Sequence, residues 1–133
     1  MYVDDLPRAE RFYVDVLELE LVSRQEGRHV FFRCGDGMLL LFNPLGSRES
    51  GSHDGGIDVP VHGSIGPGHI AFAACEDDLA AWAAHLEHHG VAIERWIDWP
   101  GGGRSLYFRD PAGNSLELAT PKIWGIPDDL PPG

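Results

Sequence analysis

An internal repeat constrains the fold of this chain more than any other feature of its sequence. Each half contains an acidic residue, an apolar stripe at helical spacing, and then β-type segments around a Gly-containing turn. The two acidic helix starts, Asp5 and Asp78, lie 73 residues apart in the sequence. Arg33 and Arg109, each preceded by Phe and followed by a turn, lie 76 residues apart. Two such agreements indicate two copies of one supersecondary unit.

Each half is predicted to contain one amphipathic helix. The first helix is expected over residues 6–17, after an N-capping aspartate and with Pro7 in its first turn. The second is expected over residues 79–89, with Asp77 or Asp78 as its cap. Gly90 follows it, where a left-handed residue commonly ends a helix.

Extended segments surround these helices. Residues 29–42 and 104–119 each read as strand, turn and strand, and residues 69–73 read as a strand before the second helix. In the first half only Tyr2 and Val3 stand at the corresponding place. The repeat places the counterpart of His69 before Met1, so we expect the first strand to be incomplete. Its place beside the sheet should be open or filled from elsewhere.

The composition of the segments predicts the domain organisation. We expect a first module over residues 1–50, with its first strand truncated, and a second module over residues 66–121. Residues 51–65, rich in Gly, Ser and Pro, read as a linker within a longer aperiodic stretch that begins near residue 43. Residues 122–133 read as a C-terminal tail.

The charge and the cysteine pattern exclude several classes of protein. The formal net charge of −11 disfavours nucleic acid and anionic membranes as partners, because both are bound through Lys and Arg. The acidity promotes solubility, or alternatively attracts a cationic ligand. Cys34 and Cys75 have neither metal-ligand nor redox spacing, and no signal peptide or membrane-spanning segment is legible. We therefore expect a cytoplasmic protein.

Several segments carry a family resemblance: residues 4–17, residues 68–72 (GHIAF), the helix start at Asp78 and residues 108–118 (FRDPAGNSLEL). Together they resemble the vicinal oxygen chelate superfamily, which includes glyoxalases, bleomycin resistance proteins and dioxygenases. The resemblance implies an α+β fold of two βαβββ modules that form a cupped, open, mixed β-barrel-like sheet. It also implies metal ligands on the first and last strands of each module.

The resemblance places two metal ligands in the second module. His69 matches the first-strand ligand and Glu117 the last-strand ligand. Strand alternation independently turns Glu117 away from its leucine neighbours. If Arg109 pairs with Ser115 across the turn, Tyr107 lies opposite Glu117. Imidazole and carboxylate together suit Fe, Mn, Ni or Zn. Without the motif, a hydrogen-bonded core histidine and a solvated glutamate would be the simpler interpretation.

The first module departs from the family pattern at its last strand. The repeat offset maps Glu117 onto Leu41, whereas pairing Arg33 with Met38 maps it onto Leu40. Both candidates are apolar, so we expect no ligand from this strand. This departure weakens an assignment as glyoxalase I, for which the resemblance implies a ligand at that place.

Four other residues are candidates for the site. His62, seven residues before His69, could act as a substitute ligand or as an acid/base group, or could be an exposed loop histidine. Tyr107 is a candidate for catalysis and for substrate binding. Trp99 could cover a ligand and Arg104 could hold an anionic group. Packing under the loop or at a dimer interface is the alternative for these two side chains.

Three functions remain open at the level of the sequence. The first is a divalent-metal-dependent enzyme, namely a lyase, isomerase, dioxygenase or thiol transferase, that acts on a small oxygen-bearing substrate. The second is a metal-free protein of the bleomycin-resistance type that sequesters a drug. The third is a non-catalytic sensor or subunit. In each case we expect a small-molecule ligand and a homodimer, because oligomers usually close with two-fold symmetry.

Overall fold

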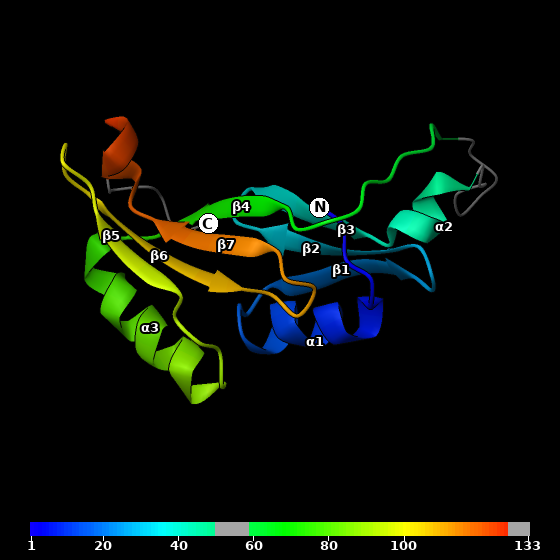
Figure 1. Ribbon diagram of the computed structural model, residues 1–133, viewed down its shortest axis with the longest axis horizontal. Helices are drawn as coiled ribbons and strands as arrows, with labels where there is room; N and C mark the ends of the chain where they lie inside the picture. The colour runs from blue at the N-terminus through cyan, green and yellow to red at the C-terminus, as the bar shows by residue number, and fades with distance from the viewer. Residues whose placement is uncertain (50–58, 128–133) are drawn as a thin grey trace. The chain divides into compact units, whose positions relative to one another are not determined.

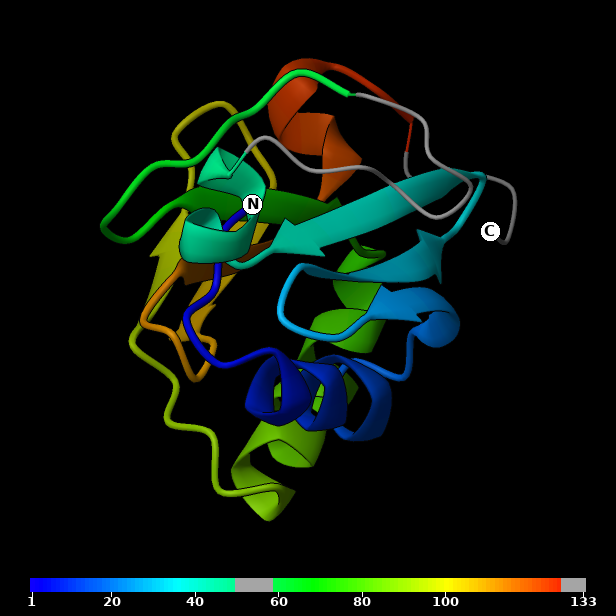
Figure 2. The same ribbon diagram turned by 90° about the vertical axis from the view of Figure 1, so that its right-hand side faces the viewer.

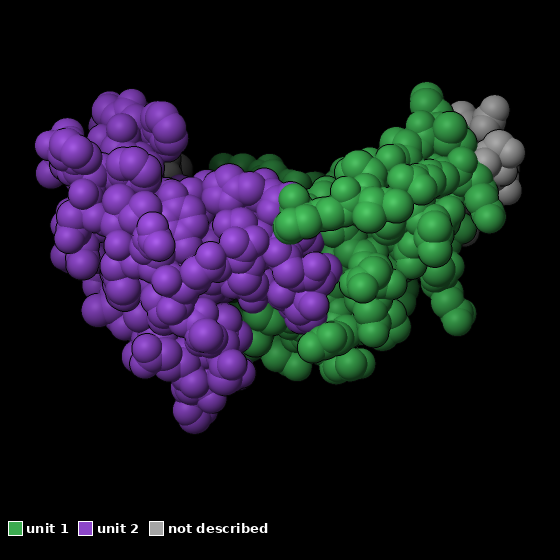
Figure 3. Space-filling view, viewed as in Figure 1, with its two compact units in different colours: residues 1–67 green, residues 68–133 purple. Residues whose placement is uncertain are grey.

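The computed structural model describes residues 1–49 and 59–127. The chain divides into two compact units, Met1–Pro67 and Gly68–Gly133 (Figure 3). Each unit is α+β and contains one sheet. In the described part of the chain, no helix is long and apolar enough to cross a membrane.

Unit 1 consists of a helix followed by an antiparallel sheet. Its elements are α1 (Leu6–Asp15), β1 (Glu20–Gln25), β2 (His29–Cys34), β3 (Gly37–Phe42) and the short α2 (Pro44–Arg48). The strands are ordered β1-β2-β3, and α1 lies against one face of this sheet (Figure 2). The segment 44–48 belongs to the stretch that we expected to be aperiodic. It is helical because the side chain of Asn43 caps it by accepting from the backbone N–H of Leu45.

Unit 2 has a strand before its helix and three strands after it (Figure 1). Its elements are β4 (His69–Ala73), η1 (Glu76–Asp78), α3 (Leu79–His88), β5 (Arg95–Asp98), β6 (Arg104–Arg109), β7 (Ser115–Ala119) and η2 (Pro121–Trp124). The strands are ordered β4-β7-β6-β5, and β4 runs parallel to β7 while the other pairs are antiparallel. This is the βαβββ order that the family resemblance implied.

The two units share one topology except at their first strand. In unit 2, β4 pairs with β7 over five residues. In unit 1, a single parallel bridge between Tyr2 and Phe42 stands at the corresponding edge. The expected α+β fold is thus confirmed, and residues 1–5 contain no complete strand. Parts of the predicted linker and tail, residues 50–58 and 128–133, lie outside the described residues.

The first helix is shorter than predicted. It ends at Asp15 rather than at residue 17, because Glu18 adopts a left-handed conformation with φ of 59°. The backbone N–H of Leu19 then donates to the carbonyl of Tyr13 and closes the helix end. At the other end, Asp5 caps the helix as expected by accepting from the N–H of Arg8.

The second helix begins differently from our prediction. Asp78 stands at its N-cap position but makes no side-chain cap hydrogen bond. The 3-10 turn η1 leads directly into α3, so Asp78 has helical backbone angles and cannot cap in the usual way. At the C-terminus, Gly90 has φ of 74° and Val91 donates to the carbonyl of Leu86, as expected for a glycine-terminated helix.

Two strands lie in segments for which the residue pattern alone predicted no strand. β1 and β5 are edge strands without a buried residue. β1 alternates only between exposed and half-buried positions and β5 is mostly exposed, so apolar periodicity does not mark them. Pairing with β2 and β6 holds them in the sheets. The core of unit 2 lies on one face of its sheet and consists of Leu79, Leu86, Leu106, Phe108, Leu116 and Leu118. The opposite face carries Ser105, Tyr107, Ser115 and Glu117.

Candidate metal centre

Alternation along the strands of unit 2 separates a core face from a polar face. Leu106 pairs with Leu118 and Phe108 with Leu116, and these side chains form the core. The side chains one residue further along point to the other face. On that face, Glu117 of β7 pairs with Tyr107 of β6 on one side and with Ala71 of β4 on the other. The predicted register is confirmed, and it aligns an aromatic, a carboxylate and a small residue.

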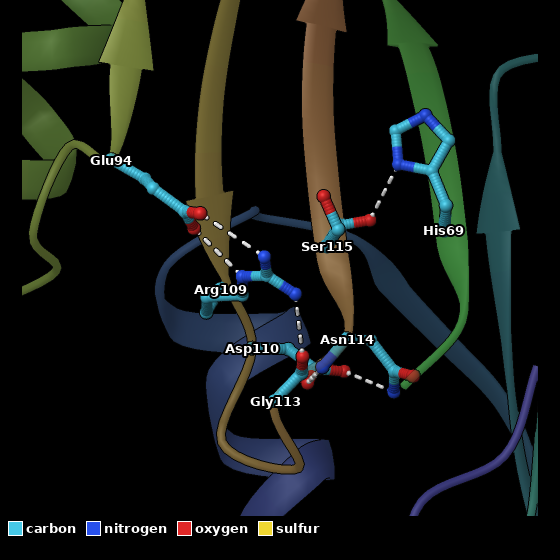
Figure 4. Close-up of polar contacts among 7 residues, drawn as sticks. All are labelled: His69, Glu94, Arg109, Asp110, Gly113, Asn114 and Ser115. Atoms are coloured by element: carbon cyan, nitrogen blue, oxygen red, sulfur yellow. Dashed lines mark hydrogen bonds and ion pairs between the residues drawn. The ribbon is translucent and has the colours of Figure 1, made fainter. Parts of the chain in front are cut away.

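His69, the first residue of β4, meets the carboxylate of Glu117. Its Nε2 atom lies 3.1 Å from Oε2 of Glu117. Its Nδ1 atom lies 3.0 Å from the backbone carbonyl oxygen of Ser115 (Figure 4). The His69 side chain is 50% exposed whereas that of Glu117 is 9% exposed. The imidazole is therefore accessible from solvent, and the carboxylate lies beneath it.

Glu117 is a buried carboxylate held by polar neighbours. Ser105, itself fully buried, donates from its hydroxyl to Oε1 of Glu117 at 2.5 Å. Tyr107 is the cross-strand partner of Glu117 on the same face of the sheet. Burying a carboxylate without such partners would be costly, so these contacts are what allow it to sit in the sheet. Oε2 is the oxygen directed toward His69.

Tyr107 contacts both predicted ligands. Its ring stacks beside that of His69, with 6.2 Å between the centroids and 20° between the planes. Burial, followed by the hydrogen bond and negative charge of Glu117, raises the pKa of the Tyr107 hydroxyl above its usual range. The hydroxyl therefore keeps its proton near neutral pH.

His69 faces a hydrogen-bond acceptor at each ring nitrogen. A neutral imidazole has one N–H and one lone pair. When Nδ1–H donates to the carbonyl of Ser115, Nε2 directs its lone pair at an oxygen of Glu117. A cation between Nε2 and Oε2, either a metal ion or the second proton of an imidazolium, satisfies both atoms. Two ligand atoms of one ion, each bound at about 2 Å, are separated by about 3 Å, and the observed 3.1 Å fits this value.

The number of protein ligands is small. Among residues 1–49 and 59–127, no group of three or more His, Cys, Asp or Glu side chains gathers as an ion-binding cluster. An ion held by His69 and Glu117 would complete its coordination with solvent, substrate or groups outside this set. The donor types, one imidazole and one carboxylate, still fit Fe, Mn, Ni or Zn.

The turn after β6 positions the start of β4. Asp110 accepts from the backbone N–H groups of Ala112 and Asn114, and its second oxygen accepts from the Asn114 amide (Figure 4). The amide oxygen of Asn114 accepts from the backbone N–H of Gly68 at 2.6 Å. Gly68 directly precedes His69. The sequence pattern predicts a turn here but gives no signal for the contact of Asn114 with the residue before β4.

An ion pair flanks the same turn. Arg109 donates from Nε and from Nη2 to the two oxygens of Glu94, and from Nη1 to the carbonyl of Gly113 (Figure 4). The hydrogen bonds from Arg109 hold the pKa of the Glu94 carboxyl below its usual range. The pair links the segment before β5 to the end of β6 at the surface.

The two predicted substrate-binding residues of the β5–β6 hairpin have different positions. The indole N–H of Trp99 donates to the hydroxyl of Ser105 at 2.9 Å, so Trp99 reaches the polar network. Arg104 instead pairs with Asp98 at 2.6 Å and lies 4.7 Å from the ring centre of Trp96. Strand alternation turns its side chain to the face opposite Ser105. The structure therefore does not bring Arg104 to the His69–Glu117 pair.

His62 lies in unit 1 and is not an exposed loop histidine. Its Nδ1 atom lies 2.9 Å from the hydroxyl of Tyr2, and its ring packs edge-on against Phe42 at 4.4 Å. Its backbone N–H donates to the carbonyl of Ser47. These contacts fasten the segment around His62 to the first sheet. Its role as a ligand or acid/base group stays a prediction.

Unit 1 presents an apolar residue where unit 2 presents Glu117. Arg33 pairs with Met38 and Phe31 with Leu40, so Leu40 is the counterpart of Glu117 and Phe31 that of Tyr107. Leu41, the other candidate from the sequence, is fully buried in the core. The position is apolar in either case, as expected.

Comparison with known proteins identifies the family. The family model of the Glyoxalase/Bleomycin resistance protein/Dioxygenase superfamily matches residues 1–118. The chain belongs to this superfamily. A lactoylglutathione lyase structure from Agrobacterium tumefaciens is 42% identical, with a TM-score of 0.87, over 95% of this chain and 92% of that one. The glutathione transferase FosA of Serratia marcescens is 33% identical over 87% of this chain and 73% of its own length.

A more distant superfamily member shares the fold as well. The fosfomycin resistance protein FosX from Mesorhizobium loti is 26% identical, with a TM-score of 0.59, over 90% of this chain and 85% of that one. The superfamily and its α+β fold are thus established for this chain. The names of these relatives describe different activities, so membership does not by itself specify the reaction.

Proposed function

We propose that this glyoxalase-superfamily chain is a divalent-metal-dependent enzyme acting on a small oxygen-bearing substrate. The observation that carries the proposal is the arrangement of His69. Its two nitrogens face two acceptors, and the Nε2–Oε2 separation of 3.1 Å from Glu117 matches that of two ligands of one ion.

The residues around the pair have roles that follow from their contacts. Ser115 accepts from Nδ1 of His69 and so leaves Nε2 as the ligand atom. Ser105 donates to Glu117 and stabilises its charge, and Tyr107 lies across from Glu117 on the neighbouring strand. A bound divalent ion would supply Lewis-acid stabilisation of negative charge on a substrate oxygen. We propose that the half-exposed imidazole gives a substrate access to that ion.

Glutathione-linked substrates are the first class to test. Two of the relatives named above carry glutathione in their names, a lactoylglutathione lyase and a glutathione transferase. The first of them is 42% identical to this chain. Leu40, at the first module's counterpart of Glu117, argues against transferring the lyase activity directly. We therefore propose the substrate class and leave lyase, isomerase, dioxygenase and transferase chemistry to the assay.

Metal-free sequestration of a drug is the second candidate. The net charge of −11 and the two-residue ligand set of the described chain favour it. For both candidates we propose a homodimer with a small-molecule ligand in the cytoplasm. Light scattering at micromolar concentration should then give twice the mass of 14.6 kDa, and a monomer mass would contradict the dimer.

Metal titration of the purified full chain tests the enzyme proposal. Mn²⁺, Ni²⁺, Zn²⁺ and Fe²⁺ are each titrated into wild type, His69→Ala and Glu117→Gln, with binding followed by calorimetry and folding by circular dichroism. We expect one ion per chain in wild type and reduced binding in both variants, without unfolding. His88→Ala, an exposed histidine at the end of α3, is the matched control for binding by surface histidines.

The outcomes separate the two candidates. Stoichiometric binding that both site variants lose, and that His88→Ala retains, supports the enzyme. Full metal occupancy in both site variants, or no binding by wild type, would refute it. Sequestration of a cationic drug would then take first place. Turnover of glutathione conjugates by the metal-loaded chain would establish the substrate class.

A further inference from the structure

Ser105 connects the β5–β6 hairpin to the carboxylate of the proposed ion site. The hydroxyl of Ser105 lies 2.9 Å from the indole nitrogen of Trp99 and 2.5 Å from Oε1 of Glu117. Ser105 is fully buried, so solvent does not compete for these bonds. The side chains of Trp99, Ser105 and Glu117 thus form one continuous series of hydrogen bonds.

The donor and acceptor groups of these three side chains fix the direction of each hydrogen bond. An indole N–H can only donate, so Trp99 occupies a lone pair on the oxygen of Ser105. The hydroxyl proton of Ser105 is then available to the carboxylate, which can only accept when ionised. The bond of 2.5 Å is in the range of a charge-assisted O–H···O⁻ contact. Oε1 of Glu117 is thereby engaged, and Oε2 is left directed at His69.

The hairpin places the indole for this contact. Trp99 begins a tight turn in which its N–H donates to the carbonyl of Gly103 and its carbonyl accepts from the N–H of Gly102. Gly103 has φ of 88°, and a Cβ there would collide with the side chains of Ile123 and Thr120. The turn is therefore packed against the η2 segment, which restricts where the Trp99 ring can lie.

We propose that Trp99 and Ser105 are positioning residues that fix the orientation of Glu117 for ion binding. The inference rests on the proposed function, because it assigns these residues to the same site. It gives Trp99 a role other than covering a ligand or packing at an interface. Carboxylate ligands are commonly oriented by such outer hydrogen bonds, whose loss typically costs about 10- to 100-fold in metal affinity.

Four variants test the chain of hydrogen bonds. Ser105→Ala removes the hydrogen bonds to Trp99 and to Glu117. Trp99→Phe removes only the indole donor, and Ser105→Thr keeps a hydroxyl at this position. Trp96→Phe is the matched control, since Trp96 lies in the same hairpin and, like Trp99, is 38% exposed. Mn²⁺ affinity is measured by calorimetry for each variant and for wild type. We expect about a 10- to 100-fold loss in Ser105→Ala, a smaller loss in Trp99→Phe, recovery in Ser105→Thr and no change in Trp96→Phe.

A second measurement tests the contact between Ser105 and Glu117 in the absence of metal. A double-mutant cycle of Ser105→Ala and Glu117→Gln on urea unfolding should show non-additivity, because the two side chains contact each other. Equal Mn²⁺ affinity in wild type, Ser105→Ala and Trp99→Phe would overturn this inference alone. Failure of wild type to bind any of the ions would overturn the proposed function and this inference with it. If Ser105→Ala does not fold, the comparison of Trp99→Phe with Trp96→Phe decides.

Discussion

The amide oxygen of Asn114 accepts a hydrogen bond of 2.6 Å from the backbone N–H of Gly68, the residue directly before His69. Asn114 is 1% exposed and lies 46 residues further along the chain. The turn after β6 therefore holds the start of β4 through a buried side chain. The conformation of one predicted ligand depends on a residue that is not itself a ligand.

Asn114→Ala should destabilise the protein and loosen His69. The change removes the hydrogen bond to the backbone N–H of Gly68 and the amide's bond to the buried carboxylate of Asp110, and losing such bonds costs about 1–3 kcal/mol. Urea denaturation measures this loss, and the NMR signals of the His69 ring should shift. Glu87→Ala, at an exposed position of α3, should change stability by no more than about 0.5 kcal/mol. Equal stability of the two variants would contradict the assigned contact.

A glutamate should be tolerated at Leu40 and not at Leu41. Leu40 is 39% exposed, whereas Leu41 is fully buried on the opposite face of β3. Leu41→Glu would bury an unpaired charge in the core and should cost more than about 3 kcal/mol. Leu40→Glu should cost no more than about 1 kcal/mol. Urea unfolding of both variants measures the difference. A larger loss of stability in Leu40→Glu than in Leu41→Glu would contradict the placement of Leu41 on the core face of β3.

The contribution of the Glu94–Arg109 pair should depend on pH. Arg109 lowers the folded-state pKa of Glu94 below its unfolded value. The stabilisation is therefore present above the unfolded pKa and is lost as the pH falls through the folded pKa. Wild type should melt at a higher temperature than Glu94→Gln at pH 7, and the difference should vanish in strong acid. Glu87→Gln provides the control. A difference that grew on acidification would contradict the prediction.

The two thiols should react at different rates. Burial raises the pKa of the Cys34 thiol, and Cys75 is exposed. Iodoacetamide should alkylate Cys75 first, because alkylation requires both access and thiolate. Peptide mass spectrometry of a time course at pH 8 measures both sites. In denaturant the two rates should converge. Faster alkylation of Cys34 in the folded protein would be inconsistent with this environment.

Local pattern was sufficient for much of the fold. The apolar stripes of residues 6–17 and 79–89 predicted both helices to within two residues, because helical periodicity is encoded in neighbouring side chains. Counting residues back from the turn at Asp110–Asn114 places Tyr107 opposite Glu117 if Arg109 pairs with Ser115, and the structure has both pairs. Register follows from turn length, which is also a local property.

The same local pattern did not determine the edge strands of the sheets or the N-cap of α3. The residue pattern did not reveal β1 and β5, since an edge strand is held mainly by its partner rather than by its own alternation. Asp77 or Asp78 was expected to cap α3, but both belong to the η1 turn, and Asp78 at the N-cap position has helical backbone angles. Neither outcome follows from residue type at a single position.

Only the tertiary structure decided the contacts of the candidate site. The sequence could place His69 and Glu117 on their strands. It could not show that Ser105 holds one oxygen of Glu117, or that Asn114 holds Gly68. It offered Arg104 as an anion-binding residue, and the fold instead pairs it with Asp98. Periodicity determines which face a side chain takes within its own strand. Which side chains meet across strands depends on sheet order and on the packing of each hairpin, and these arise only when the whole unit folds.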